Sequence, residues 1–517
     1  MSETENRAGR REWVGLAVLT LPCLLISMDI GVLFFALPFI SAALRPSATQ
    51  QLWIMDAYGF VLAGMLITMG ALGDRIGRRR LLLIGAAAFG AASAGAAYAG
   101  SAAMLIAMRG VLGLAGSTLM PSTLALIRNM FHDEKQRKSA VGVWTGAFTG
   151  GVVLGPVVGG FLLNHFWWGS AFLINIPAMA LLLLLGPLLL PEYRPADPAR
   201  FDMLGAVLSL AAVLCTIYGI KKLAVDGYSA SATAALLVGL ALAAAFVRRQ
   251  LGHENPLIDL RLFSSPVFSS SVLIKIVATF ALTGTSLFTN QYLQLVLGMR
   301  PLTAALWSLT AFPALMVAMS ASVAVSNKVR PGPILLSGLA VIAAGLGVVT
   351  QVDADSRLWV VLVGAGGLAA GVMITAPIVA DLVLTAASTE QAGAASAVAE
   401  TSDEFGSALG LAVLGSIGAS VYHHRMADIA VPGAPHDAVR SARGTLAAAK
   451  AVAEAMPGGA GSGLLRQARE AFTAGMNIAA LAGILVVAAL AVGVSVLLRR
   501  APAAAPVPRP DAEPARK

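Results

Sequence analysis

Long apolar stretches, separated by short polar or charged segments, recur along the whole chain of 517 residues. About 20 apolar residues is the length of helix that spans the hydrocarbon core of a bilayer. We expect fourteen such helices, at residues 13–38, 50–72, 81–100, 102–127, 139–162, 170–190, 203–223, 231–249, 269–296, 302–325, 333–350, 358–385, 393–421 and 472–497. A soluble protein could not bury so many helices that are apolar on every side. The pattern therefore predicts an all-α integral membrane protein.

The basic residues between these helices alternate in density. Clusters such as those at Arg75 and Arg249 follow even-numbered helices, whereas the opposite short loops hold mainly Arg45, Arg300 and Arg357. Cytoplasmic loops carry an excess of lysine and arginine. Both termini are therefore predicted to lie in the cytoplasm.

Composition excludes several classes of protein. The chain is 57% hydrophobic and 12% charged, with a mean hydropathy of +0.79, whereas a soluble domain carries roughly 25% charged residues. Its net charge of +9 comes from basic residues in loops, so it does not indicate nucleic-acid binding. Cys23 and Cys215 both lie in apolar stretches, which argues against a disulfide framework. No phosphate-binding loop motif occurs, so ATP hydrolysis is not expected to drive the protein. We expect no enzyme activity, cofactor or metal.

A glycine-punctuated basic turn follows the second apolar stretch, with the residues Gly73, Asp74, Arg75, Gly77 and Arg78. Its glycines permit a tight turn and close approach of helices. Its aspartate can accept hydrogen bonds from a helix N-terminus or pair with an arginine, and such contacts could latch one conformation. The alternative is a plain cytoplasmic anchor, which would not need the aspartate.

A second glycine pattern lies in the fifth apolar stretch, at Gly151, Gly155, Pro156, Gly159 and Gly160. Glycines at this spacing form a smooth face for close helix packing, and the proline favours a kink. The spacing matches the antiporter motif of drug:proton exchangers, although helix packing alone would also explain it.

Acidic residues inside apolar stretches are costly and are functional by default. Asp29 and Asp56 lie within the first and second stretches, while Glu400, Asp403 and Glu404 lie on the thirteenth. Buried acids bind protons with a raised pKa and attract lipophilic cations. We predict proton-coupling or substrate roles for Asp29, Asp56, Glu400 and Glu404, although any single acid could instead be a packing residue.

Two basic residues and two aromatic residues complete the predicted site. Arg109 lies inside the fourth stretch, where it could transfer protons, close the outer half or cap backbone carbonyls. Lys275 is expected to form an ion pair with one of the acids. Trp53 and Tyr58 flank Asp56, and aromatic rings can stack on a flat or quaternary cation.

Several segments together resemble the 14-helix drug:proton antiporters of the major facilitator superfamily, especially exporters of methyl viologen and quaternary ammonium compounds. The resemblance runs from about residue 13 to 497 and rests on Trp53-Ile54-x-Asp56-x-Tyr58, Gly70-Ala71-Leu72-Gly73-Asp74-Arg75, Gly142-Val143-Trp144, Trp168-Gly169-Ser170, Phe172-Leu173-Ile174-Asn175 and Ile258-Asp259-x-Arg261-Leu262-Phe263. The chain departs from the family at Leu112, where the motif that begins at Arg109 carries glutamine. It also lacks the acid that some members have in the tenth helix, which puts dication handling in doubt.

The resemblance implies two six-helix halves plus two inserted helices. The expected organisation is a cytoplasmic N-terminus at 1–12, an N-terminal half at 13–190, a linker region with the two extra helices at 191–268, a C-terminal half at 269–497 that includes an external loop at 422–471, and a disordered cytoplasmic tail at 498–517.

The resemblance also implies a monomer in a bacterial inner membrane that exports lipophilic cations in exchange for protons. The main alternative is a proton-coupled exporter of an endogenous metabolite, a lipid or an antibiotic. A membrane sensor or scaffold without transport would have no reason to bear the cost of buried acids.

Overall fold

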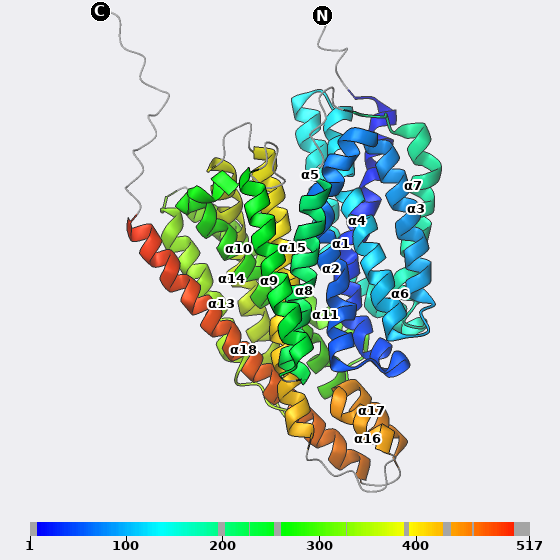
Figure 1. Ribbon diagram of the computed structural model, residues 1–517, viewed down its shortest axis with the longest axis vertical. Helices are drawn as coiled ribbons and strands as arrows, with labels where there is room; N and C mark the ends of the chain where they lie inside the picture. The colour runs from blue at the N-terminus through cyan, green and yellow to red at the C-terminus, as the bar shows by residue number, and fades with distance from the viewer. Residues whose placement is uncertain are drawn as a thin grey trace, which may run out of the picture.

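The computed structural model describes residues 8–194, 202–226, 228–252, 260–326, 328–386, 392–427, 436–456 and 460–500. In these ranges the chain is helical and contains no strand, which confirms the predicted all-α fold (Figure 1). Residues 1–7 and 501–517, which hold most of the two predicted tails, lie outside the described ranges.

The described helices are numerous enough for the predicted fourteen crossings. Thirteen segments are long and apolar enough to span a membrane. A further one is bent by 55° between Ala48–Leu66 and Thr68–Ile76, and counting it as one span gives fourteen.

The N-terminal half consists of α1 (Arg10–Leu44), α2 (Ala48–Ile76), α3 (Arg78–Ala97), α4 (Ala102–Met130), α5 (Glu134–His165), α6 (Ser170–Leu173) and α7 (Asn175–Leu189). Helix α1 packs along α5, α2 packs along α4, and α3 lies between α4 and α7. One apolar core joins these helices.

The C-terminal half consists of α10 (Pro266–Gln291), a π-helical turn (Tyr292–Val296), α11 (Pro301–Leu309), α12 (Phe312–Ser326), α13 (Pro331–Val349), α14 (Leu358–Thr385), α15 (Ala392–Met426) and α18 (Ala460–Arg500). A short 3₁₀ helix (Leu260–Ser264) precedes it. Helix α10 packs along α15, α13 packs along α14, and α18 contacts both α13 and α15.

Two further helices, α8 (Met203–Asp226) and α9 (Ala230–Gly252), form an antiparallel hairpin between the halves in sequence. Helix α8 contacts α2 of the N-terminal half and α15 of the C-terminal half. Phe60, Ile217, Ala408 and Ala412 form an apolar cluster at this junction. The hairpin therefore covers one side of the seam between the halves.

Helices α16 (His436–Gly444) and α17 (Leu446–Ala455) lie at the end of the bundle opposite the start of α1 and the end of α18 (Figure 1). The halves touch near this end, where α5 packs against α11. Pro301, the first residue of α11, lines a pocket of about 370 Å³ together with Ala447 of α17. We call this end of the bundle the α17 end.

Candidate functional site

A buried arginine joins three helices of the N-terminal half. Arg109 of α4 donates from Nη1 to the Asp29 carboxylate of α1, and both side chains are at most 4% exposed. Its Nε donates to the Ile54 carbonyl at 3.1 Å and its Nη2 to the Met55 carbonyl at 3.5 Å, both on α2. Arg109 therefore caps backbone carbonyls, one of the functions considered from the sequence, and also forms an ion pair that the sequence did not predict.

The same arginine borders a small cavity between the two halves. Its guanidinium carbon lies 4.7 Å from the centre of the Tyr58 ring, a distance typical of a cation–π contact. Asp56, Tyr58 and Arg109 line the cavity from the N-terminal half, and Ser407 and Leu411 line it from the C-terminal half. Its volume is about 20 Å³, which is room for about one water molecule.

The structure thus brings together four of the residues predicted from sequence, Asp29, Asp56, Tyr58 and Arg109. Trp53 lies one turn from Asp56, and its ring contacts Phe60 edge-on with centroids 6.3 Å apart. It is not among the residues that line this cavity. We call the four residues the α1–α2–α4 cluster.

The predicted acids of the C-terminal half lie on α15. Glu400 and Glu404 belong to this helix, but their side chains lie outside the described part of the structure. Asp403 does form an ion pair with Lys275 of α10, with 2.7 Å between Oδ2 and Nζ. The prediction that Lys275 pairs with one of the acids is confirmed, and Asp403 is the partner.

A polar and glycine-rich stripe follows the same face of α15 from Asp403. Ser407 lies one turn further and is hydrogen-bonded to Thr283 of α10 at 2.6 Å. A Cβ at Gly406 or Gly410 would lie 2.4 Å or less from atoms of α10. Sequence reasoning missed Ser407, although its position four residues after an intramembrane aspartate places both on one helix face.

The glycine motif of α5 allows close approach to two neighbours. A Cβ at Gly151, Gly155 or Gly159 would lie within 3.0 Å of α1, and one at Gly160 would lie 2.6 Å from the Leu302 Cα of α11. Pro156 fits against α1 where Gly31 lacks a side chain. Every glycine of the motif therefore lies at a close helix contact. The role of the motif in antiport stays a prediction.

The basic turn folds back on its own half. Asp74 and Arg78 form an ion pair across one helical turn, with 2.6 Å between Oδ1 and Nη2. Gly73 leaves room for the Arg78 side chain, whose Cδ would lie 3.0 Å from a Cβ at that position. Arg75 points to the surface. Of the two contacts expected for Asp74, the structure contains the arginine pair.

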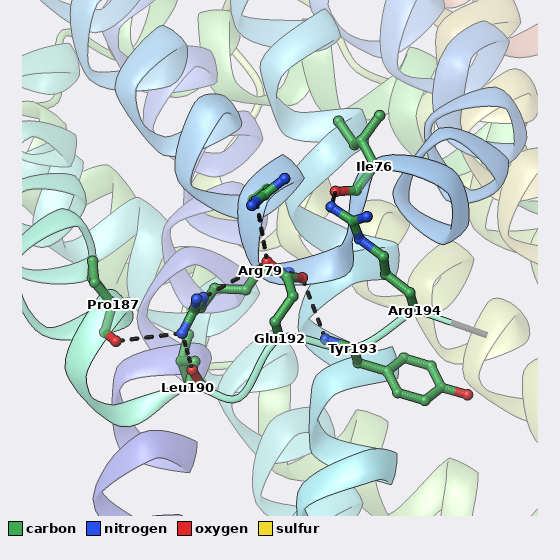
Figure 2. A network of polar contacts seen from close by, with 8 residues as sticks. Ile76, Arg79, Pro187, Leu190, Glu192, Tyr193 and Arg194 are labelled. Atoms are coloured by element: carbon green, nitrogen blue, oxygen red, sulfur yellow. Dashed lines mark hydrogen bonds and ion pairs between the residues drawn. The ribbon is translucent and has the colours of Figure 1, made fainter. Parts of the chain in front are cut away.

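The turn also docks onto the segment after α7, as Figure 2 shows. Arg79 donates to the Leu190 carbonyl at 2.9 Å, and its backbone N–H donates to Glu192 at 3.1 Å. Arg194 donates to the Ile76 carbonyl at 2.7 Å. Gly77 has φ +109°, and a Cβ there would lie 2.5 Å from Glu192 Oε1. Sequence reasoning missed Glu192 because it lies in a loop with no motif around it.

A buried carboxylate links the start of α8 to the end of α9. Asp202 precedes α8 and accepts hydrogen bonds from Arg249 at 2.8 Å, the Gly205 N–H at 2.9 Å and Gln250 at 3.2 Å. Burial alone would raise the pKa of Asp202, but these donors and the arginine charge outweigh it and lower the pKa from its usual 3.8. The carboxylate therefore fastens the start of α8 to the end of α9.

Comparison with known families is decisive for the fold. Residues 20–411 match the Major Facilitator Superfamily, which is well over half of the chain. The chain belongs to the Major Facilitator Superfamily. It is therefore a multi-pass membrane transporter, and the two halves described above are those of a major facilitator.

Within this superfamily the chain is similar to several drug-resistance proteins over nearly its whole length. It is 43% identical to the multidrug efflux pump LfrA of Mycolicibacterium smegmatis over 497 residues, which cover 96% of this chain and 98% of LfrA. It is 34% identical to the methyl viologen resistance protein SmvA of Salmonella typhimurium over 474 residues, 89% and 93% of the two chains. It is 31% identical to the tetracenomycin C resistance and export protein of Streptomyces glaucescens, over 96% and 95%.

A solved major facilitator has the same fold. The bacterial homologue of the human lysosomal transporter Spinster superposes with a TM-score of 0.63, covering 95% of this chain and 98% of that one. The two sequences are 16% identical, so this likeness concerns the fold alone.

Proposed function

We propose that this major facilitator is a proton-coupled multidrug efflux antiporter that exports lipophilic cations such as quaternary ammonium compounds, methyl viologen and dyes. The observation that carries the proposal is the α1–α2–α4 cluster at the seam between the halves. There, Asp56 and the buried Arg109 line a cavity that both halves share, and Asp29 pairs with that arginine. Intramembrane acids at such a place mark ion and substrate pathways.

The charge of this cluster supports competition between a proton and a cation. If both carboxylates are ionised, two acids and one guanidinium leave one net negative charge. One proton or one monovalent cation neutralises that charge, and binding both would leave an excess positive charge in a low-dielectric site. Exclusive occupancy by one or the other is what an exchanger needs.

The exchange also balances the electrical work. Moving one positive charge outward against about 100 mV, inside negative, costs roughly 2.3 kcal/mol. Entry of one proton cancels this cost, and entry of two makes export stronger.

The proposed orientation places both termini in the cytoplasm and the α17 end outside. In that orientation the contact between α5 and α11 closes the outer side of the described conformation. The turn at Gly73, Asp74, Arg75, Gly77 and Arg78 would act at the cytoplasmic side, where breaking the Asp74–Arg78 pair frees both groups to bind the other half. The protein would work as a monomer, since each chain holds both halves of the site.

The test is uptake of ethidium, a monovalent lipophilic cation, into inside-out proteoliposomes containing the purified protein, with and without an imposed pH gradient. We expect uptake only with the gradient, its loss on adding a protonophore, and its loss in Asp56→Asn. Uptake that continues undiminished after the protonophore would exclude proton coupling.

An alternative function, proton-coupled export of an endogenous metabolite, lipid or antibiotic, draws support from the 31% identity to the tetracenomycin C resistance and export protein. Binding to Asp56→Asn without a gradient separates cationic from uncharged substrates. A cation should lose its binding, whereas an uncharged compound, which would need Asp56 only for protons, should still bind.

A further inference from the structure

A second pocket lies inside the C-terminal half, between α10, α11, α12 and α14. Its volume is about 160 Å³, close to the roughly 150 Å³ of an apolar cavity that holds one benzene ring. Its polar side chains are Thr285, Ser286, Thr289 and Asn290 of α10 and Ser308 of α11, and no charged residue is among those that line it. The facing wall on α14 consists of leucine, alanine and glycine. We call it the α10 pocket.

Three of the four hydroxyl groups of this pocket donate their protons within their own helices. Each donates to the carbonyl four residues earlier: Ser286 to Leu282 at 2.8 Å, Thr289 to Thr285 at 3.1 Å and Ser308 to Ala304 at 3.0 Å. A hydroxyl has one proton and two lone pairs. Each of the three oxygens can therefore only accept a further hydrogen bond.

The amide of Asn290 adds another acceptor. Its nitrogen donates to the Ser286 carbonyl at 2.9 Å. Its oxygen is buried and accepts no hydrogen bond from any residue that the structure describes. A buried acceptor without a donor is costly, so a ligand that supplies an N–H here gains that energy back.

Helix α10, which forms one wall of the α10 pocket, contacts a residue of the cavity between the halves. Thr283, between two residues that line the α10 pocket, is hydrogen-bonded to Ser407, which lines the cavity between the halves. A molecule larger than one ring could therefore be recognised by charge at one site and by hydrogen bonds at the other.

We propose that the α10 pocket is a subsite that selects cations bearing N–H groups, such as protonated amines and amidinium ions, over quaternary cations, which have no N–H to donate. This inference rests on the proposed function, because cation export makes such ions candidate substrates.

The experiment compares two probes of equal charge and with the same phenylbutyl group, 4-phenylbutylammonium and its N,N,N-trimethyl analogue, which differ only in whether the nitrogen bears hydrogens or methyl groups. Calorimetry measures their binding to purified wild-type protein in nanodiscs and to Thr289→Val/Asn290→Leu, which removes two acceptors. The matched control is Thr375→Val, whose hydroxyl also donates within its own transmembrane helix, at 3.0 Å, but which does not line the pocket.

We expect the double variant to bind the ammonium probe about tenfold more weakly, the effect of two net hydrogen bonds, and to bind the trimethyl probe within about twofold of wild type. If the double variant does not fold, Thr289→Val alone should lose about threefold for the ammonium probe only. Equal losses for both probes, or no loss for either, would overturn the inference.

Export of both probes from proteoliposomes keeps the two proposals apart. Selective binding without export of either probe would refute the proposed function and leave the subsite in place. Export of both probes with no difference in the double variant would refute the subsite and leave the proposed function in place.

Discussion

Gly160 is the place where one added methyl group should change the balance between conformations. It lies near the end of α5, at the contact between the halves. A Cβ there would lie 2.6 Å from the Leu302 Cα and 2.8 Å from the Leu302 backbone nitrogen. These are backbone atoms, so no side-chain rotation can relieve the clash.

The size of the effect follows from this geometry. Carbon atoms in contact lie about 3.5–4.0 Å apart, so α5 and α11 must separate by about 1 Å or more. Overpacking of this kind costs about 1–3 kcal/mol. The cost falls only on conformations in which the halves touch at the α17 end. Gly160→Ala should therefore shift the equilibrium toward conformations open at this end by about fivefold to 150-fold.

A cysteine at Ala305 reports the opening. Ala305 of α11 is fully buried and belongs to the apolar core of the N-terminal half. Its thiol should react with a membrane-impermeant maleimide only when the halves part. We expect Gly160→Ala to raise the labelling rate of Ala305→Cys several-fold. The rate of the protein without Ala305→Cys, which has only Cys23 and Cys215, is subtracted first.

Gly150→Ala is the matched control, because a Cβ at Gly150 meets no atom within 4 Å and the residue lies on the same helix. Ala305→Cys combined with Gly150→Ala should label at the same rate as Ala305→Cys alone. If Gly160→Ala also labels at the wild-type rate, the contact with Leu302 does not hold this end closed and the reasoning fails.

Three more predictions concern stability. Asp29→Asn leaves the Arg109 guanidinium buried without its carboxylate, so the free energy of unfolding should fall by about 3–5 kcal/mol. Transport of every substrate should also be impaired. Denaturant unfolding unchanged from wild type would contradict the buried ion pair. Gly151→Ala would place a Cβ 2.3 Å from a carbonyl oxygen of α1, so its melting temperature should drop clearly, whereas Gly150→Ala should melt like wild type. Asp202→Asn should destabilise the protein at pH 7, measured by thermal unfolding. Because the folded-state pKa of Asp202 lies below 3.8, its contribution is present above that pH and is lost as the pH falls through the folded-state pKa. The gap between variant and wild type should therefore close in acid, and a gap that widens there would refute the assignment.

The fold could be predicted from the sequence because each transmembrane helix can be recognised from its own segment alone. A run of about 20 apolar residues has few alternatives in a bilayer, and the loop charges add an orientation. The bend in α2 could not be predicted, since no proline lies inside that helix.

Which residues meet across helices could not be predicted, because the rotation of each helix is set by packing with its neighbours. Asp29 and Arg109 were both expected to be functional, but nothing in their own segments shows that they pair across 80 positions. Lys275 was expected to have an acidic partner, and only the packing of α10 on α15 decides for Asp403. Gly150 and Gly151 are equivalent in a spacing rule, yet one faces open space and the other faces α1.

The two ion pairs suggest why the halves can move as units. Arg109 with Asp29, and Lys275 with Asp403, each neutralise a charge within one half and link helices of that half. Neither pair crosses the seam, so separating the halves breaks neither of these two ion pairs, and breaking a buried pair such as Arg109–Asp29 would cost several kcal/mol. Near the cluster, the two halves meet at a cavity that Asp56 lines from the N-terminal half and Ser407 and Leu411 line from the C-terminal half. Under the proposed function, the proton or cation bound at that cavity would be the charge whose binding favours one arrangement of the halves over the other.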